Sequence, residues 1–328
     1  MSAQALRWGI LSTARINRSL IPPIKKSRFN QLTAVASRNL EKAQAYAMEW
    51  GIPKAFGSYE EMLADKDIDV IYNPLPNSLH AEWTIRAVQA GKHVLCEKPL
   101  ALTVNEVDAI REAAEKAGKI AVEGFMYRHH LQTMKVKELL DNGTIGNLRY
   151  VRGYFSYKLS EQGDVRLDRE LGGGSIWDIG CYPISYARYL IGEEPVSVFG
   201  WQVVGPSGVD LTFVGQLLFP NQVIAQFDSS FDAPFRAYIE VVGSEGVIQV
   251  PHPYKPDNRE KIRLIRGDRV EEIAVHGLEV YQSEVEDLSD AVINGKAPRV
   301  SLADSRGNTA AIVALLESAR SGSPILMQ

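Results

Sequence analysis

Short apolar runs alternate with segments of helical spacing throughout the first 124 residues, and this feature most constrains the fold. Helical segments of about a dozen residues separate most of the runs, and Gly51, Gly91 and Gly118 stand where such helices would end. Strands joined in this way indicate a parallel, doubly wound sheet, in which ligands bind beyond the carboxyl ends of the strands. The five candidate strands are residues 7–11, 31–37, 68–72, 93–96 and 119–123.

The pattern changes in the second half of the chain, where short strands and turns dominate from residue 196 onward. Turn sequences such as Pro220-Asn221 and Gly267-Asp268 separate these strands, which is typical of an antiparallel sheet. We therefore predict two domains. Residues 1–124 form a domain with a parallel, doubly wound sheet, and residues 125–328 form a second domain with a large, mostly antiparallel sheet. The last helix, near residues 302–320, is a candidate for packing back on the first domain.

Composition excludes several classes of protein. The chain has 328 residues and a net charge of −4, so it lacks the positive excess of a nucleic-acid or membrane-surface binder. No apolar run approaches the roughly 18 residues that a membrane span needs, and residues 1–7 do not begin a secretory signal. Two cysteines make no disulfide scaffold. We expect a cytoplasmic protein without a metal site.

The turn after the first strand has the position of a dinucleotide-binding fingerprint but lacks its glycines. Ser12, Ala14 and Asn17 stand where three glycines would let the backbone approach a pyrophosphate. The alternative interpretation is an ordinary tight turn, in which small residues are also common. If the turn binds a dinucleotide, its cofactor-binding residues are Ser12, Thr13, Ala14, Arg15 and Ile16.

The end of the second strand indicates which dinucleotide is bound. An NAD site has an acid here to accept hydrogen bonds from the ribose hydroxyls, whereas this chain has Ser37-Arg38 and no acid before Glu41. The Arg38 guanidinium can contact a 2′-phosphate, Ser37 can donate to it, and Lys42 lies one helical turn further on. These residues favour NADP over NAD, with a solvated arginine at a helix start as the alternative.

Two other segments carry residues suited to catalysis. Glu97-Lys98-Pro99 follows the fourth strand, and the proline restricts the backbone of the lysine, which is either a placed cation or an ordinary surface charge. After the glycines at 172–174, Asp178 and Tyr182 are four residues apart on a predicted helix and share one face. An acid and a phenol on one face can bind and deprotonate a hydroxyl. The alternative is a half-buried tyrosine whose hydroxyl has a structural partner.

Three motifs together resemble one family: residues 75–82 (LPNSLHAE), 90–99 (AGKHVLCEKP) and 172–182 (GGGSIWDIGCY). On these motifs the chain resembles the Gfo/Idh/MocA superfamily of glucose–fructose oxidoreductase and inositol dehydrogenase, over nearly its whole length. The resemblance implies an N-terminal dinucleotide-binding Rossmann domain over residues 1–124 and a C-terminal substrate-binding and oligomerisation α+β domain with an open sheet over residues 125–328. It also implies reversible hydride transfer between NAD(P) and a sugar, polyol or related carbonyl compound. It also implies a homodimer or homotetramer formed through the C-terminal sheet.

The site residues of this family carry over by position. Lys98 matches the catalytic lysine, and Asp178, Gly180 and Tyr182 match the D-x-G-x-[HY] segment. Tyrosine at the last position is similar to the branch of glucose–fructose oxidoreductase, dimeric dihydrodiol dehydrogenase and NADP-dependent xylose dehydrogenase. Ser185 replaces an aspartate of the histidine branch, which argues against inositol dehydrogenase activity. The resemblance further implies cofactor contacts from Leu75, Asn77, His80, Glu97 and Lys98.

The resemblance and the residue chemistry together predict a mechanism. A tyrosine has a free pKa of about 10, and a nearby ammonium lowers it, so Tyr182 can exchange a proton with the reacting oxygen while Lys98 orients and polarises that oxygen. Segments 125–130 and 163–166 also resemble nucleotide-sugar 3-ketoreductases. The predicted substrate-binding residues are Lys98, Tyr127, His130, Arg166, Asp178 and Tyr182.

Several other motifs have structural interpretations. The neighbours His129-His130 point to opposite faces of a strand and make a poor metal pair. Cys96 and Cys181 are expected as small buried side chains. Segments 58–61 and 103–106 have the pattern of helix capping boxes.

Three alternative functions stay open beside the leading prediction of an NADP-dependent sugar dehydrogenase or ketoreductase. A trans-dihydrodiol or xylose dehydrogenase of the same branch differs only in its substrate. A non-catalytic NADP-binding regulatory protein occurs in the superfamily, but the presence of both Lys98 and Tyr182 and the absence of a basic patch disfavour it. An NAD-dependent glycosidase is disfavoured by the NADP-type pair Ser37-Arg38.

Overall fold

The computed structural model describes residues 5–159 and 163–327, and its contacts divide the chain into two compact units. The first unit runs to Phe125 and also includes Tyr281–Arg306, while the second comprises Met126–Val280 and the residues from Gly307 onward. The sequence places a single boundary after residue 124, whereas the first unit takes a further segment from late in the chain. That segment holds nearly all of α8 (Val280–Asn294), the last helix but one, and only the start of α9 (Leu302–Ser321).

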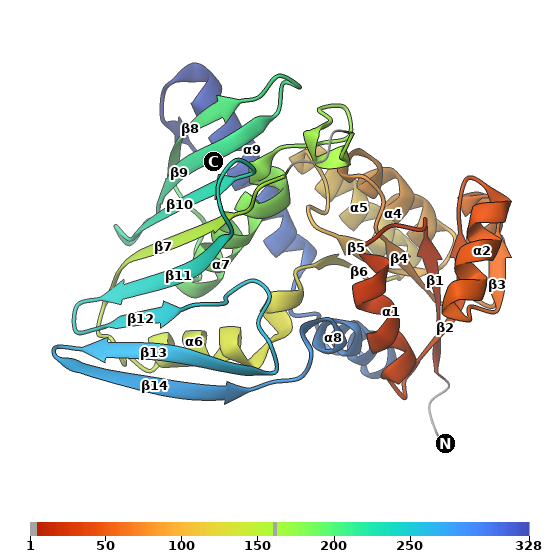
Figure 1. The fold of residues 1–328 in the computed structure, drawn as a ribbon, viewed down its shortest axis with the longest axis horizontal. Helices are drawn as coiled ribbons and strands as arrows, with labels where there is room; N and C mark the ends of the chain where they lie inside the picture. The colour runs from red at the N-terminus through yellow and green to blue at the C-terminus, as the bar shows by residue number, and fades with distance from the viewer. Residues whose placement is uncertain (1–4, 160–162, 328) are drawn as a thin grey trace. The chain divides into compact units, whose positions relative to one another are not determined.

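A six-stranded parallel sheet forms the first unit, in the order β3-β2-β1-β4-β5-β6 (Figure 1). This order confirms the doubly wound Rossmann sheet that the alternating pattern predicts. The strand order reverses beside β1, which is where such sheets bind their ligands. The strands are β1 (Leu6–Leu11), β2 (Asn30–Ala36), β3 (Lys54–Phe56), β4 (Val70–Asn73), β5 (His93–Glu97) and β6 (Ala121–Gly124); the helices between them are α1 (Asn17–Lys26), α2 (Leu40–Trp50), α3 (Tyr59–Ala64), α4 (His80–Gln89) and α5 (Val104–Ala117).

Helices cover both faces of this sheet. α3, α4 and α5 pack apolar side chains such as Met62, Trp83 and Ile110 into one core. Trp8 of β1 is outside that core, and its indole N–H donates to Asn30 Oδ1 at 2.6 Å. Ser289 of α8 donates to the same oxygen at 2.9 Å. This shared hydrogen bond ties α8 to β1 and β2, which explains why a helix from late in the chain belongs to the first unit.

A nine-stranded sheet forms the second unit, in the order β14-β13-β12-β11-β7-β10-β9-β8-β15 (Figure 1). All neighbouring strands are antiparallel except β7 and β10, so the prediction of a large, mostly antiparallel sheet is confirmed. The strands are β7 (Leu148–Ser156), β8 (Ser197–Val204), β9 (Asp210–Leu218), β10 (Ile224–Ser230), β11 (Arg236–Gly243), β12 (Val247–Val250), β13 (Arg259–Arg266), β14 (Arg269–His276) and β15 (Ile325–Leu326).

The two faces of this sheet differ. α6 (Leu131–Asp141), α7 (Cys181–Ile191) and the second-unit part of α9 pack on one face, where the Gly200 N–H donates to Ser318 Oγ of α9 at 3.2 Å. Side chains alternate along a strand, so every second residue points away from these helices. On that opposite face, the exposed apolar side chains include Trp201, Val203, Val214 and Ile224.

Candidate active site

The turn between β1 and α1 has glycine-like backbone geometry although it contains no glycine. Ser12 has a φ of 68°, in the left-handed region that residues other than glycine seldom adopt. Its N–H donates to Ala36 O at 2.8 Å, and the Asn17 side-chain amide donates to Ser12 O at 3.0 Å. The Ser12 hydroxyl oxygen is buried and has no hydrogen-bond partner among the described residues. Such a conformation, with a buried polar atom left over, is typical of a ligand site.

The same turn leads into the N-terminus of α1. Thr13, Ala14, Arg15 and Ile16 follow Ser12 at the carboxyl end of the central strand. The first turn of α1 has no acidic residue and no side-chain cap, so nothing on it repels an anion. The turn therefore fits the pyrophosphate of a dinucleotide.

The residues predicted to select NADP follow β2, the strand beside β1. Ser37 is buried, and its hydroxyl accepts a hydrogen bond from Asn39 N at 3.4 Å. Arg38 and Lys42 are exposed, and Lys42 lies in the first turn of α2, where its N–H donates to the Asn39 cap at 2.9 Å. Because Leu11 and Ala36 pair at the ends of their strands, these residues leave the sheet at the same edge as Ser12.

His80 braces two loops at this edge. It is 1% exposed, with Nδ1 at 2.7 Å from Pro99 O and Nε2 at 2.6 Å from Leu75 O, in the loop that also carries Asn77. Two carbonyl contacts favour a protonated ring, but burial, helped by the Lys98 ammonium, outweighs them and lowers the pKa of His80 to about 4. Both ring nitrogens face backbone carbonyls, so His80 braces the two loops, and the cofactor contact that the sequence predicts for it stays a prediction.

Glu97 and Lys98 end β5 and begin the loop after it, and both are half-buried. Tyr72 of the neighbouring strand β4 is fully buried and donates its hydroxyl to Glu97 Oε1 at 2.6 Å. Burial, together with that carboxylate, raises the pKa of Tyr72 well above its usual range, so the phenol remains a donor. The Lys98–Pro99 peptide bond is cis. The adjacent strand thus holds the carboxylate that precedes the predicted catalytic lysine.

The first unit therefore brings its predicted cofactor residues to one edge of one sheet. The turns after β1, β2, β4 and β5 all leave the parallel sheet at its carboxyl edge. The backbone of Ser12, the start of α1 and the exposed Arg38 together fit a phosphorylated dinucleotide.

In the second unit, Asp178 and Tyr182 lie on a helix that begins with a wide turn. Ile176–Gly180 form a π-turn, and α7 continues it from Cys181. We refer to residues 176–191 as the Tyr182 helix. The sequence predicts a regular helix with both side chains on one face, whereas a π-turn changes the angle between successive side chains. Single π-turns are rare and occur frequently at functional sites.

Asp178, Arg166 and Tyr157 form one hydrogen-bonded cluster. Asp178 Oδ2 accepts from the Tyr157 hydroxyl at 2.8 Å and from Arg166 Nε at 3.1 Å. Arg166 Nη1 also lies 3.2 Å from Asp164 Oδ1. Burial and the Asp178 carboxylate raise the pKa of Tyr157, so its phenol stays a donor. The structure thus joins two residues that the sequence predicts separately as substrate ligands.

Tyr182 is 4% exposed and lies in an aromatic cluster. Its ring centroid is 5.8 Å from that of Tyr127, 5.6 Å from that of Phe155 and 5.5 Å from that of Tyr254. The hydroxyl donates to Met126 Sδ at 3.6 Å. Because sulfur is a weak acceptor, this contact can be exchanged for a substrate oxygen at little cost, while the aromatic neighbours keep the ring in place.

Tyr127 and His130 are predicted substrate ligands that also have structural contacts. Tyr127 is fully buried, stacks on Tyr186 at 5.2 Å and donates its hydroxyl to Ser185 Oγ at 2.8 Å. His130 is also fully buried, and as the N-cap of α6 its Nδ1 accepts from Gln132 N at 3.1 Å. These contacts use the Tyr127 hydroxyl and His130 Nδ1, and the substrate contacts that the sequence predicts for the two residues stay a prediction.

The sequence patterns do not single out two residues that contact the Tyr182 helix. Met126 accepts the Tyr182 hydrogen bond, and Asp210 of β9 binds the start of the helix through Ile176. The single sequence signal for Asp210 is an acid directly before an apolar strand, which usually marks a turn.

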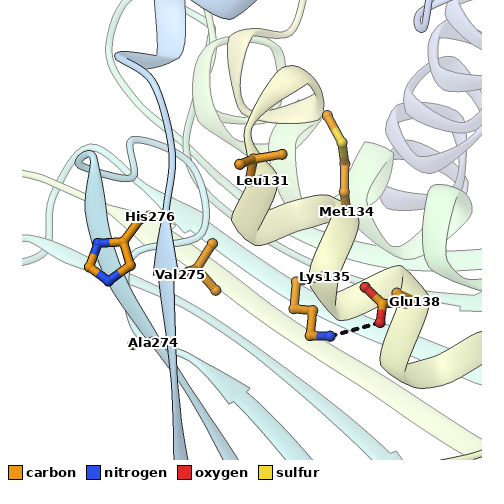
Figure 2. Close-up of a pocket in the computed structure, with 7 residues that line it drawn as sticks. All are labelled: Leu131, Met134, Lys135, Glu138, Ala274, Val275 and His276. Carbon is orange, nitrogen blue, oxygen red and sulfur yellow. Dashed lines mark hydrogen bonds and ion pairs between the residues drawn. The ribbon is translucent and has the colours of Figure 1, made fainter.

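A groove of about 300 Å³ lies between α6 and β14 in the second unit (Figure 2). Figure 2 shows the Lys135–Glu138 ion pair, at 2.7 Å, along one side of it. The groove contains none of the predicted site residues, and it is not part of the candidate active site. Its lining residues are Leu131, Met134, Lys135, Glu138, Ala274, Val275 and His276.

Residues 5–159 and 163–327 contain neither a metal-binding cluster nor a membrane-spanning helix. Within them, no three or more His, Cys, Asp or Glu side chains are arranged to hold a metal ion. No helix in the same residues is long and apolar enough to cross a membrane. Cys96 and Cys181 are fully buried, as the sequence predicts.

Comparisons with known proteins agree with this fold. Residues 6–125 match the oxidoreductase family with an NAD-binding Rossmann fold, and residues 133–249 match the GFO/IDH/MocA C-terminal domain. The chain is 37% identical to a D-xylose 1-dehydrogenase (NADP(+)) of Haloferax volcanii over 325 residues, which cover 98% of this chain and 99% of the relative.

Two solved structures are similar over almost the whole chain. The aldose-aldose oxidoreductase of Caulobacter crescentus, complexed with glycerol, has a TM-score of 0.92 at 29% identity and covers 99% of this chain and 100% of its own. The 3-ketoreductase KijD10 of Actinomadura kijaniata, in complex with NADP and TDP-benzene, has a TM-score of 0.92 at 28% identity. The match covers 96% of this chain and 98% of the ketoreductase chain. The resemblance seen in the sequence is thereby confirmed, and this chain belongs to the Gfo/Idh/MocA family of oxidoreductases.

Proposed function

We propose that this protein is an NADP-dependent oxidoreductase that transfers a hydride between the cofactor and a hydroxyl or carbonyl group of a sugar-like substrate. Tyr182 exchanges the proton with the reacting oxygen, and Lys98 orients and polarises that oxygen. The observation that carries the proposal is the environment of Tyr182, whose ring is held among aromatic side chains while its hydroxyl donates to the weak sulfur acceptor of Met126. The π-turn immediately before it holds Asp178.

Support for NADP comes from the edge of the first sheet. Ser12 and the start of α1 would hold the pyrophosphate, and Arg38 and Lys42 would hold the 2′-phosphate, since no acid precedes Glu41 after β2. The bound nicotinamide would supply or accept the hydride. The xylose dehydrogenase relative is named for NADP(+), and the similar ketoreductase was crystallised with NADP.

Tyr182 and Lys98 have complementary tasks in the acid–base step. Oxidation of a hydroxyl releases a proton, which the Tyr182 oxygen accepts, and reduction of a carbonyl takes the proton back. The Lys98 ammonium stabilises negative charge on the reacting oxygen and favours the ionised form of the tyrosine that must act as a base. Lys98 belongs to the first unit and Tyr182 to the second.

Asp178 would bind a further hydroxyl of the substrate. Tyr157 and Arg166 both bond to its Oδ2, and this fixes the orientation of the carboxylate. A carboxylate accepts hydrogen bonds from neutral hydroxyls, which suits a polyhydroxy compound. Aldoses are therefore the first substrates to test.

The test is a screen of the purified protein with NADP⁺ or NAD⁺ and a panel of aldoses, including D-xylose, together with a trans-dihydrodiol. We expect NADPH to form with at least one aldose, and NADP⁺ to be used in preference to NAD⁺. Tight NADPH binding without turnover of any aldose, diol or corresponding carbonyl compound would contradict the proposal and favour a regulatory protein.

We further propose that the protein forms a homodimer or homotetramer through the open face of its nine-stranded sheet. Trp201 and Val203 are each 62% exposed there, and Val214 and Ile224 lie on the neighbouring strands. An exposed apolar patch of this kind is typical of an interface. Light scattering should show an oligomer that Trp201→Glu dissociates and that the control Met48→Glu, at an exposed site on α2, leaves intact. A monomeric natural protein would contradict this arrangement.

A further inference from the structure

Strand β9 begins with a buried carboxylate that binds the start of the Tyr182 helix. Asp210 is 4% exposed. Its Oδ2 accepts a hydrogen bond from Ser175 Oγ at 2.6 Å and another from the Ile176 N–H at 2.8 Å. One oxygen of a neighbouring strand therefore takes two donors from the point where the helix begins. Unpaired N–H groups at a helix start need such acceptors, and an anion there also interacts favourably with the helix dipole.

The contact is close enough to require a glycine beside it. Gly174 has a φ of 128°, and a Cβ at this position would lie 2.3 Å from Asp210 Oδ1. Any side chain would therefore push the carboxylate and the chain before Ser175 apart. The last glycine of the Gly172–Gly174 run is therefore needed because the backbone passes so close to the Asp210 side chain.

The adjacent strand β10 lies close to both ends of the π-turn. Ser229 Oγ lies 3.0 Å from Ser175 Oγ, just before the turn. A Cβ on Gly180, the last residue of the turn, would lie 3.0 Å from the same Ser229 oxygen. Asp210 and Ser229 thus bind the start of the turn from two strands, and Ser229 leaves little room for a side chain at its end. Asp178 lies inside this turn, and Tyr182 follows it by two residues.

We propose that Asp210 is a positioning residue, which holds Ser175 and Ile176 and thereby sets the place of Asp178 and Tyr182. The inference rests on the proposed function, because it concerns a reaction that uses Tyr182. Asp210 itself would touch neither the substrate nor the cofactor.

The energetics of Asp210 are unusual for a residue that serves stability alone. Burial raises the pKa of its carboxyl to about 6, since the hydrogen bonds from Ser175 and Ile176 only partly offset the loss of hydration. A neutral acceptor would bind the same donors without burying a charge. A carboxylate at this position makes shorter and stronger hydrogen bonds to Ser175 and Ile176 than a neutral acceptor would, and such bonds suit a positioning role.

The test compares Asp210→Ala with Asp210→Asn, which keeps an oxygen acceptor of the same shape. The control is Glu260→Ala, because Glu260 is another buried carboxylate of the second unit that accepts from a backbone N–H, that of Asp257 at 2.7 Å, but does not contact the Tyr182 helix. We would measure kcat and KM, the Kd for NADPH, and amide hydrogen exchange over residues 175–182.

We expect Asp210→Ala to lower kcat by about 10- to 100-fold, because small misplacements of acid–base groups have effects of this size. The Kd for NADPH should be unchanged, and exchange over residues 175–182 should be faster. Asp210→Asn should restore most of kcat, and Glu260→Ala should change neither kcat nor this exchange. A folded Asp210→Ala protein with natural kcat and natural exchange would overturn the proposal.

The proposal can be judged separately from the proposed function. If the natural protein reduces no sugar-like carbonyl and oxidises no hydroxyl, the proposed function fails. The contact of Asp210 with the helix is judged by hydrogen exchange alone, and faster exchange in Asp210→Ala, but not in Asp210→Asn or Glu260→Ala, still supports it. If Asp210→Ala does not fold, Ser175→Ala removes one of the two donors and should lower kcat by a smaller factor. Natural kcat and exchange in Ser175→Ala would then overturn it.

Discussion

The Tyr157 hydroxyl donates to Asp178 Oδ2 across 2.8 Å, and this bond fixes the carboxylate that we propose as a sugar ligand. Tyr157→Phe removes only the donor. We expect kcat/KM for the sugar to fall by about tenfold, because the carboxylate loses a charge-assisted hydrogen bond, with no change in the Kd for NADPH. Tyr154→Phe, a tyrosine of β7 on the open face of the sheet, serves as the control. Equal kcat/KM values in the two variants would contradict the role of Tyr157.

His80 joins the loop after β4 to the loop after β5, and its loss should affect both. His80→Ala should lower the free energy of unfolding by about 1–3 kcal/mol and weaken NADPH binding, because Leu75 O and Pro99 O lose their contacts with the ring. Urea unfolding and fluorescence titration measure the two effects. His93→Ala is the matched control, since His93 accepts from Ile120 N and touches neither loop. Unchanged NADPH affinity in His80→Ala would show that the brace does not shape the cofactor site.

Substitution of Arg38 tests the preference for NADPH over NADH. Arg38→Ala should weaken NADPH binding by about 10- to 100-fold, the size of a charge-assisted contact with a phosphate, and should leave NADH binding nearly unchanged. Arg111→Ala, an exposed arginine of α5 paired with Asp108, should change neither. Equal losses for the two cofactors would exclude a contact between Arg38 and the 2′-phosphate.

Asp210 gives stability an unusual dependence on pH. Its pKa is about 6 in the folded protein against an ordinary 3.8, so between these values the folded state binds the proton more tightly than the unfolded state. This favourable contribution is complete at low pH and is lost as pH rises to about 6. Asp210→Asn does not titrate. Its stability relative to the natural protein should therefore increase by about 2 kcal/mol between pH 4 and pH 7 in urea unfolding, and a constant difference would contradict the shift.

Most of the first unit follows from local patterns in the sequence. Alternating apolar runs predict the parallel sheet, and the capping residues Ser58 and Thr103 bind the N–H groups of Glu61 and Glu106 as their patterns indicate. β3 has only three residues, too few for a clear pattern, and α1 contains Pro22 and Pro23. The place of α8 depends on contacts with residues far away in the chain, such as that between Ser289 and Asn30, which no local pattern records.

The parts of the candidate site that depend on backbone conformation could be predicted from motifs. The side-chain contacts, which depend on packing between distant segments, could not. Ser12 keeps a glycine-like conformation, so its position in the fingerprint was informative although the glycine is absent. Tyr127 and His130 are buried, and the structural hydrogen bonds of the Tyr127 hydroxyl and of His130 Nδ1 do not follow from the sequence motif. Asp210 acts from another strand, and only the three-dimensional contact with Ile176 reveals it.

The central claim is that Tyr182 carries the proton in the reaction, and Tyr182→Phe tests it most directly. The substitution keeps the ring among Tyr127, Phe155 and Tyr254 and removes only the hydroxyl, so the fold and the Kd for NADPH should be unchanged. The decisive measurement is kcat for NADP-linked turnover of the best substrate. We predict a fall of about 10²- to 10⁴-fold, the usual contribution of a general acid–base group, whereas a kcat equal to that of the natural enzyme would contradict the account.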